Sequence, residues 1–366
     1  MNIVIAIDSM KGCLTSTQAS HAVMSGIRQA RPDAQVTAIP VSDGGEGMLE
    51  AFGAALQCSA ITATVHDPLM RPVTAQYGIT PDGLTAVIET AQACGLTLLA
   101  PAERDPLVAT SRGAGELIAD AMRHGCTRLI VGLGGSATVD GGCGMLEALG
   151  IDIIDDRVDT THSLLNGRQI EVIVAGDVSN PLCGTDGAAR VFGPQKGATP
   201  DMVITLERRL SHLADLTAQA LGTDHRNSPG AGAAGGMGFA LMAYLNATMR
   251  PGADLLLDLL DFDRQVAGAD LVITGEGSAD RQTLMGKLPL CVMRRARANG
   301  VPTVLLAGRV GDRQALLDAG FTAVHCINPA DSPLDQCLRP AIARQRLADW
   351  GCRLALGRDP GATWEL

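Results

Sequence analysis

Apolar and polar residues follow one another in segments that are typical of an α/β protein. Residues 2–8 and 35–41 are largely apolar and predict strands. The stretch between them predicts a helix over 15–30, which a turn and capping residues precede and Arg31, Pro32 and Asp33 end. The same alternation returns near the end of the chain, with strands predicted over 270–274 and 302–307 and helices over 288–299 and 313–319. We therefore expect one parallel sheet built from both ends of the chain.

The middle of the chain has a different pattern. Residues 73–77 and 85–89, on either side of a Pro-Asp-Gly turn, predict a hairpin, and two further apolar strands are predicted over 128–131 and 170–175. The fold class that we predict is α/β with two domains. Residues 1–60 and 262–366 form a domain with a flavodoxin-like or Rossmann-like parallel sheet. Residues 61–261 form a mixed α/β domain that is inserted into the first. We expect the active site in the cleft between these domains.

Composition narrows the class of protein. The 366 residues include 46% apolar and only 2% aromatic side chains, and no apolar run reaches the roughly 18 to 20 residues of a membrane helix. A net charge of −10 without a basic block argues against a nucleic-acid surface. The ten cysteines are dispersed and form no pattern with metal-ligand spacing, which favours reduced thiols in the cytoplasm. We expect a cytoplasmic protein whose partner is a small molecule.

Lysine is rare and is always next to glycine. Among 29 basic residues the lysines are Lys11, Lys196 and Lys287. An ammonium group is a compact charge that binds phosphate, so these positions suggest phosphate chemistry. The alternative is the chance survival of a few lysines in an arginine-rich chain.

Two glycine-rich runs offer backbone amides to a phosphate. The run 132–142 follows a predicted strand and precedes a helix, and it contains Gly134, Gly135 and Ser136. The run 229–236 contains Gly232 and Gly235 and precedes another predicted helix. For this second run, tight helix packing through small residues is an equally good explanation.

Carboxylates stand in the glycine-rich loops that follow the predicted strands. They are Asp43, Glu46, Asp177, Glu276 and Asp280. Any one of them could be a turn or capping residue, but five in the same context suggest acceptor positioning and metal binding. Since Gly286-Lys287 is followed by Leu288, the pattern indicates a small-molecule kinase outside the P-loop class.

Two rival functions remain open at this point. Gly132, Gly134 and Ala137, with Asp152 at ribose-binding distance along the chain, fit a dinucleotide fingerprint and would indicate an NAD-dependent oxidoreductase of a small hydroxy acid. Glycines at 141, 142 and 144 disfavour it, because they would fall in the first turns of the fingerprint helix. The other rival is a non-catalytic nucleotide-binding protein.

Several motifs together resemble the bacterial glycerate kinase type 1 family, over nearly the whole chain and in order. They are DSMKG (8–12), PVSDGGEG (40–47), ATSRG (109–113), GDVSNPL (176–182), FGPQKGA (192–198), and the segments 132–144, 229–236 and 274–287. The chain departs from the family pattern at Met10, Cys13, Ser278 and Ala279, which leaves the charged positions intact.

This resemblance implies ATP-dependent phosphorylation of D-glycerate with Mg²⁺, at the 2-hydroxyl, in glyoxylate, glucarate or galactarate breakdown. It implies D-glycerate and ATP as partners and leaves a homodimer open. We expect Lys11 and Lys287 to clamp phosphate or carboxylate groups, and Asp43 or Asp280 to position the hydroxyl. Asp177 and Glu276 are expected to bind Mg²⁺, and Ser9 and Arg309 to bind glycerate. The residues expected to hold the nucleotide are Gly134, Gly135, Ser136, Lys196, Gly232 and Gly235.

Overall fold

The computed structural model describes residues 1–10, 12–45, 47–154 and 156–358. Lys11 and Glu46, two of the expected site residues, lie outside the described part of the chain. The chain divides into two compact units. The first comprises Met1–Asp43, Glu50–Ala55 and Ala253–Leu366, and the second comprises Gly44–Leu49 and Leu56–Gly252.

The first unit is built on a five-stranded parallel sheet in the order β13-β12-β11-β1-β2. Its strands are β1 (Asn2–Ile7), β2 (Gln35–Ala38), β11 (Leu271–Ala279), β12 (Thr303–Val310) and β13 (Ala323–Cys326). Its helices are α1 (Ser16–Ala30), α10 (Phe262–Val266), α11 (Leu288–Ala298), α12 (Arg313–Ala319), α13 (Leu334–Cys337), α14 (Pro340–Ala355) and the short 3-10 helix η5 (Thr283–Met285). The predicted parallel sheet from both chain ends is confirmed.

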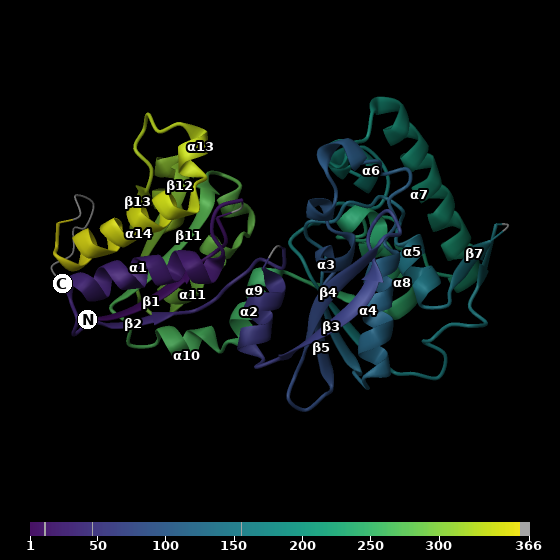
Figure 1. Cartoon of the computed structure of the whole chain (residues 1–366), viewed down its shortest axis with the longest axis horizontal. Helices are drawn as coiled ribbons and strands as arrows, with labels where there is room; N and C mark the ends of the chain where they lie inside the picture. The colour runs from purple at the N-terminus through teal and green to yellow at the C-terminus, as the bar shows by residue number, and fades with distance from the viewer. Residues whose placement is uncertain (11, 46, 155, 359–366) are drawn as a thin grey trace. The chain divides into compact units, whose positions relative to one another are not determined.

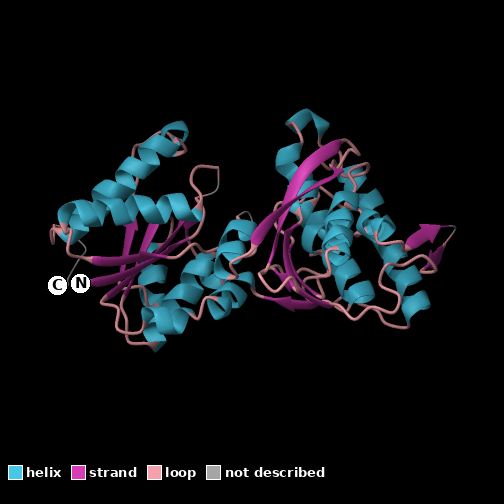
Figure 2. Cartoon of the chain, turned by 60° about the horizontal axis from the view of Figure 1, so that its bottom comes forward, coloured by secondary structure: helices cyan, strands magenta, loops and turns pink. Residues whose placement is uncertain are grey.

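Helices cover both faces of this sheet (Figures 1 and 2). On one face α1 and α14 pack against β1 through a core that includes Val23, Trp350 and Ile5. On the other face α11 and α12 contribute Met293 and Leu316 to a second core. Helix α1 begins with a capping box, in which Thr15 and Gln18 each accept a hydrogen bond from the other's backbone N–H.

The second unit contains a six-stranded mixed sheet in the order β10-β9-β6-β5-β4-β3. Its strands are β3 (Ser59–His66), β4 (Pro72–Ile79), β5 (Thr85–Glu89), β6 (Arg128–Gly132), β9 (Glu171–Ala175) and β10 (Thr248–Arg250). A separate antiparallel pair is formed by β7 (Asp152–Ile154) and β8 (Arg157–Asp159). The hairpin predicted around residue 82 is confirmed as the antiparallel pair β4–β5.

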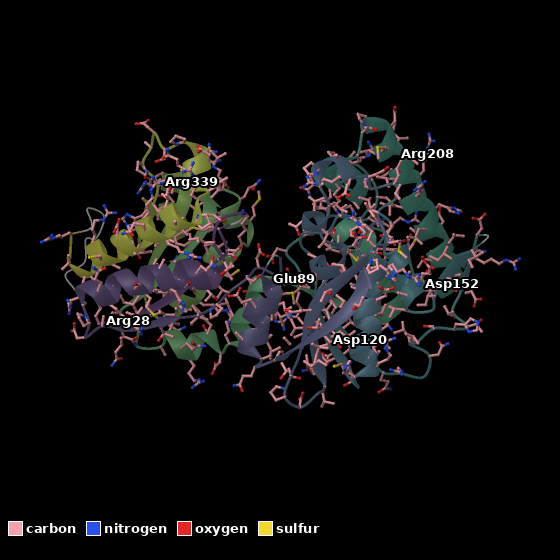
Figure 3. All side chains as sticks on the ribbon, in the orientation of Figure 1. Arg28, Glu89, Asp120, Asp152, Arg208 and Arg339 are labelled. Atoms are coloured by element: carbon pink, nitrogen blue, oxygen red, sulfur yellow. The ribbon has the colours of Figure 1, made fainter. Side chains whose placement is uncertain are left out.

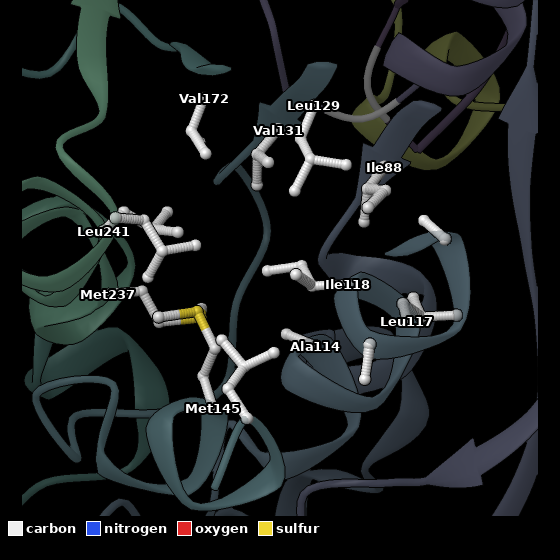
Figure 4. Packing of buried hydrophobic residues seen from close by; sticks show 14 of the residues in the cluster. Ile88, Ala114, Leu117, Ile118, Leu129, Val131, Met145, Val172, Met237 and Leu241 are labelled. Carbon is white, nitrogen blue, oxygen red and sulfur yellow. The ribbon is translucent and has the colours of Figure 1, made fainter. Parts of the chain in front are cut away.

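Helices and buried aliphatic side chains fill the space beside the mixed sheet. The helices are α3 (Ala91–Cys94), α4 (Arg112–Arg123), α5 (Cys143–Ala148), α6 (Ala188–Phe192), α7 (Pro200–Leu221) and α8 (Met237–Leu245), with 3-10 helices η1 (Leu96–Leu98), η2 (Pro101–Glu103), η3 (Pro194–Lys196) and η4 (Ala233–Gly236). Figure 4 shows how Ile118 and Met145 pack with Val131 of the sheet and Leu241 of α8. Helices α2 (Met48–Ala55) and α9 (Gly252–Leu259) carry residues of both units. None of the described helices is long and apolar enough to cross a membrane.

Two strands differ from the sequence prediction in a way that affects the site. Strands β11 and β12 reach Ala279 and Val310 instead of ending at residues 274 and 307, because they continue to pair with each other beyond the rest of the sheet. Glu276 therefore lies within a strand, and the prediction that it stands in a loop after the strand is wrong.

Candidate active site

The order of the parallel sheet determines where a ligand is expected. From β1 the chain crosses over to β2 on one side, whereas β11, β12 and β13 follow one another on the other side. The crossover direction therefore changes between β1 and β11. Open α/β sheets bind ligands outside the carboxyl ends of the strands at such a point.

A cavity of about 1000 Å³ lies at these strand ends. Its lining comes from the segments that follow β1, β2 and β13, from the ends of β11 and β12, from the start of α11, and from α12, α13 and α14. The charged side chains that line it are Asp8, Asp43, Glu276, Lys287, Arg309 and Arg313. The lining residues that the structure describes all belong to the first unit.

The end of β1 supplies a buried carboxylate. Asp8 is 7% exposed, its backbone N–H donates to the carbonyl oxygen of Gly275, and its Oδ1 accepts a hydrogen bond of 2.7 Å from the backbone N–H of Ser9. The hydroxyl of Ser16 donates to the carbonyl oxygen of Ile7 and accepts from the N–H of Val41, so it ties this strand end to the segment after β2. Asp8 was part of a quoted motif but was not among the expected site residues.

Glu276 and Lys287 face each other in the cavity lining. Glu276 is buried, its Oε1 accepts a hydrogen bond of 2.5 Å from the Thr283 hydroxyl, and its Oε2 lies 3.5 Å from the Lys287 ammonium nitrogen. Burial raises the pKa of the Glu276 carboxyl, and the hydrogen bond from Thr283 and the charge of Lys287 offset only part of this rise.

Basic side chains enter the cavity from the region of β12. Arg309 lies opposite Ser278 in the β11–β12 pair, and both residues line the cavity. Arg313 begins α12, and its guanidinium donates to the carbonyl oxygen of Val324. Arg313 was not expected at the site, because nothing in the local pattern links a residue at this helix start to ligand binding.

Asn328 was missed for a different reason. Its amide nitrogen donates to the carbonyl oxygen of Gly308 at 2.7 Å, and its amide oxygen accepts from the guanidinium of Arg346. It follows β13, a short strand that the apolar pattern did not predict.

Five of the expected site residues thus meet at one cavity. They are Ser9, Asp43, Glu276, Lys287 and Arg309. Asp280 is not among the described residues that line the cavity. Its Oδ1 accepts from the N–H of Gln282 and its own N–H donates to the Thr283 hydroxyl, an arrangement that stabilises the turn after β11.

The expected nucleotide residues lie in the second unit, where Lys196 is buried. Its ammonium group donates to the Ser136 hydroxyl and to the carbonyl oxygen of Thr138, each at 2.8 Å. Burial lowers the pKa of Lys196 to about 8, although the thiol of Cys94 and the carboxylate of Asp140 act in the opposite direction. Hydrogen bonds from this buried lysine therefore stabilise the 132–142 run.

The glycines of the two runs make close backbone contacts. A Cβ atom on Gly134 would lie 2.5 Å from the Cα of Gly45, and one on Gly235 would lie 1.9 Å from the carbonyl oxygen of Thr138. A Cβ on Gly232 would lie 2.3 Å from the carbonyl oxygen of Pro181. Gly135 has a φ of +76° and is exposed. The packing explanation of the 229–236 run matches these contacts.

The remaining carboxylates of the second unit have different surroundings. Asp177 is exposed, and its Oδ1 accepts a hydrogen bond of 3.1 Å from the N–H of Gly252. Glu89, labelled in Figure 3, is buried at the end of β5 and accepts a hydrogen bond from the N–H of Leu49. It was not among the expected site residues. Among the described residues no group of three or more histidine, cysteine, aspartate or glutamate side chains is placed to hold a metal ion.

The dinucleotide interpretation of residues 132–137 requires Asp152 at the end of a neighbouring parallel strand. Asp152 instead lies in β7, which pairs in antiparallel fashion with β8 and is not part of the six-stranded sheet (Figure 3). The βαβ unit that would bring this carboxylate to a ribose is therefore missing from the described chain.

Comparison with known proteins identifies the family. The model of the glycerate kinase family matches residues 3–355. The chain belongs to the glycerate kinase family. A glycerate kinase from Bacillus subtilis and a glycerate 2-kinase from Escherichia coli K12 are each 42% identical to it over 358 residues, which cover 93% of this chain and 94% of each relative.

A solved structure resembles this member of the glycerate kinase family over nearly its full length. It comes from Salmonella typhimurium LT2 and is described as a candidate glycerate kinase 2. The two chains superpose with a TM-score of 0.83 at 39% identity, and 98% of each chain is covered.

Proposed function

We propose that this protein transfers the γ-phosphoryl group of ATP to the 2-hydroxyl of D-glycerate, giving 2-phosphoglycerate and ADP. The family supports the reaction, and the cavity at the switch point of the parallel sheet is the observation that carries the proposal. It combines cations for a carboxylate and phosphates with carboxylates that can hold a hydroxyl group. The oxidoreductase alternative is not favoured, since Asp152 lies outside the six-stranded sheet.

The substrate groups can be assigned to cavity residues by charge. Arg309 offers a planar guanidinium to the glycerate carboxylate, and Ser9 offers a hydroxyl group in the same cavity. Asp43 is proposed to orient the 2-hydroxyl and to accept its proton as the oxygen attacks the γ-phosphorus and the bond to ADP breaks. Lys287 is proposed to neutralise charge on the transferred group.

Magnesium is proposed to arrive bound to ATP. Both oxygens of Glu276 already have partners in Thr283 and Lys287, and no cluster of three candidate ligands is present in the described chain. This donor set does not fit a dedicated metal centre. It fits a Mg²⁺ ion that is carried largely by phosphate oxygens and water.

The experiment is a ³¹P NMR analysis of the product formed from ATP, Mg²⁺ and D-glycerate. We expect a phosphate resonance coupled to a single proton, as in 2-phosphoglycerate. A resonance coupled to two protons would identify 3-phosphoglycerate and overturn the proposed position. An absorbance change at 340 nm with NAD and glycerate would support the oxidoreductase. Thermal stabilisation by MgATP without glycerate-dependent ADP release would support a non-catalytic binding protein.

We further propose a cytoplasmic location and a role in glyoxylate, glucarate or galactarate breakdown. The ten cysteines form no disulfide bond in the described chain, which is typical of a reducing compartment. The pathway rests on the resemblance of the motifs alone.

A further inference from the structure

The cavity of the first unit is much larger than a three-carbon acid requires. Cavities of about 300 to 1000 Å³ accommodate ligands of drug size, and this one has a volume of about 1000 Å³. The residues proposed above for glycerate occupy only the part of the lining that comes from the segments after β1 and β2 and from the end of β12. The rest of the cavity can accept a second and larger group.

The rest of the lining is predominantly apolar, and part of it comes from a helix that contributes none of the residues proposed for glycerate. Met10 and Cys13 contribute to it from the segment after β1, and Leu334, Cys337 and Leu338 contribute from α13 and its C-terminal end. Met10 is 4% exposed, so its side chain is held in place by the first core. We call these five residues the apolar wall.

Two members of the apolar wall are unusually accessible for their type. Leu334 is 73% exposed and Leu338 is 43% exposed. Large aliphatic side chains that line a cavity and still face water gain free energy when a flat apolar group covers them.

The lining of the cavity as a whole is complementary to a nucleotide. Its apolar wall suits a base, whereas Lys287 and Arg313 line the same cavity and suit phosphates. It also lies at the switch point of the sheet, where open α/β folds bind nucleotides.

We propose that the adenosine half of ATP binds against the apolar wall, with its phosphates directed to the cations of the same cavity. This inference rests on the proposed kinase function and places the nucleotide in the first unit. It departs from the expectation that the glycine-rich runs hold it. The buried ammonium of Lys196 already donates to Ser136 and Thr138, so it stabilises the 132–142 run.

Cysteine alkylation tests the proposal without turnover. Cys13 and Cys337 belong to the apolar wall, and Cys58 and Cys352, which are also partly exposed, are matched controls outside the cavity lining. The full chain is treated with N-ethylmaleimide and each site is quantified by mass spectrometry. We expect saturating adenosine or ATP to slow alkylation of Cys13 and Cys337 at least about fivefold and to leave both controls unchanged. Unchanged rates at Cys13 and Cys337, or equal slowing at all four cysteines, would overturn the proposal.

Kinetics of surface variants give an independent test. Leu334→Ser and Leu338→Ser replace exposed side chains, so both variants should fold. We expect each to raise KM for ATP about fivefold, as loss of part of an apolar contact predicts, and to leave KM for D-glycerate unchanged. Leu356→Ser is the control, because Leu356 is 47% exposed and is not among the described residues of the cavity lining. An unchanged KM for ATP in both cavity variants would overturn the proposal.

These results separate the inference from the proposed function. If wild-type protein forms no phosphoglycerate, the kinase proposal fails whatever the alkylation pattern. If it forms phosphoglycerate and adenosine gives no protection, the kinase proposal stands and the adenosine site is wrong.

Discussion

The carboxylate of Glu276 lies 3.5 Å from the ammonium of Lys287, and both side chains line the cavity at the ends of the parallel strands. The carboxylate is buried, whereas the lysine is partly exposed. A carboxylate held in this way remains costly to ionise, because the partial ion pair does not replace the water it has lost. We infer that the ionised Glu276–Lys287 pair lowers the free energy of unfolding while it keeps both charges in the cavity.

Replacing Glu276 by Gln should reveal this cost as a function of pH. The pKa of Glu276 is raised above its usual 4.5 by burial, so above that pH the unfolded chain loses the proton before the folded one. The wild type therefore loses stability relative to Glu276→Gln as pH rises through this window. Urea unfolding between about pH 4 and about pH 8 measures the difference. If the unfolding free energy of the wild type instead rises relative to that of Glu276→Gln as pH increases, burial does not raise the pKa of Glu276.

The residues that could be predicted from the sequence are those at or beyond the carboxyl ends of strands with a clear apolar pattern. Ser9, Asp43 and Arg309 were expected at one edge because parallel strands present their carboxyl ends together, and the structure brings them to the same cavity. Asn328 could not be found in this way, since β13 is only four residues long. Its contribution depends on contacts with Gly308 and Arg346, which are distant in sequence from it.

The direction of a side chain is harder to predict than its neighbourhood. Lys196 and Lys287 both stand next to glycine, and the pattern treats them alike. In the structure Lys287 lines the cavity, whereas Lys196 is 3% exposed and donates to Ser136 and Thr138. The difference arises from tertiary packing around Lys196, which no local pattern records.

Asp43 and Asp280 should respond differently to the same substitution. Asp43→Asn should lower kcat at least about 100-fold, because an amide cannot accept the hydroxyl proton. Asp280→Asn should keep kcat within about twofold, because the amide oxygen can still accept from the N–H of Gln282 and preserve the turn. Steady-state assays with ATP and D-glycerate measure both. Equal losses would show that the turn residue also acts in catalysis, and equal retention would remove Asp43 from the mechanism.

Lys196→Met should change the dependence of stability on alkaline pH. In the folded protein Lys196 loses its proton near pH 8, whereas its pKa is 10.5 when it is solvated. Between these values the unfolded chain holds more protons, so the wild type gains stability as pH rises, by up to about 1.4 kcal/mol per pH unit. The variant lacks this gain. We expect the unfolding free energy of the wild type minus that of the variant to increase from about pH 8 to about pH 10. A constant difference would show that Lys196 keeps its usual pKa.

Gly235→Ala and Gly167→Ala together test whether the 229–236 run is required for packing. Both glycines have left-handed φ angles, +69° and +72°, so an added methyl group strains the backbone of each by about 1 kcal/mol. The two glycines differ in the room for a side chain. A Cβ on Gly235 would lie 1.9 Å from the carbonyl oxygen of Thr138, whereas no atom lies within 4 Å of a Cβ on Gly167.

The difference between these two variants isolates the close contact from the backbone strain. Thr138 also accepts the hydrogen bond from Lys196, so its carbonyl oxygen cannot retreat without weakening that bond. We therefore expect Gly235→Ala to lose at least about 2 kcal/mol more unfolding free energy than Gly167→Ala, the scale of an overpacked interior. Urea unfolding followed by circular dichroism measures both, and a Gly235→Ala chain that does not fold at all agrees with the prediction. Equal losses would mean that the run can move aside, as a loop that opens for a phosphate would.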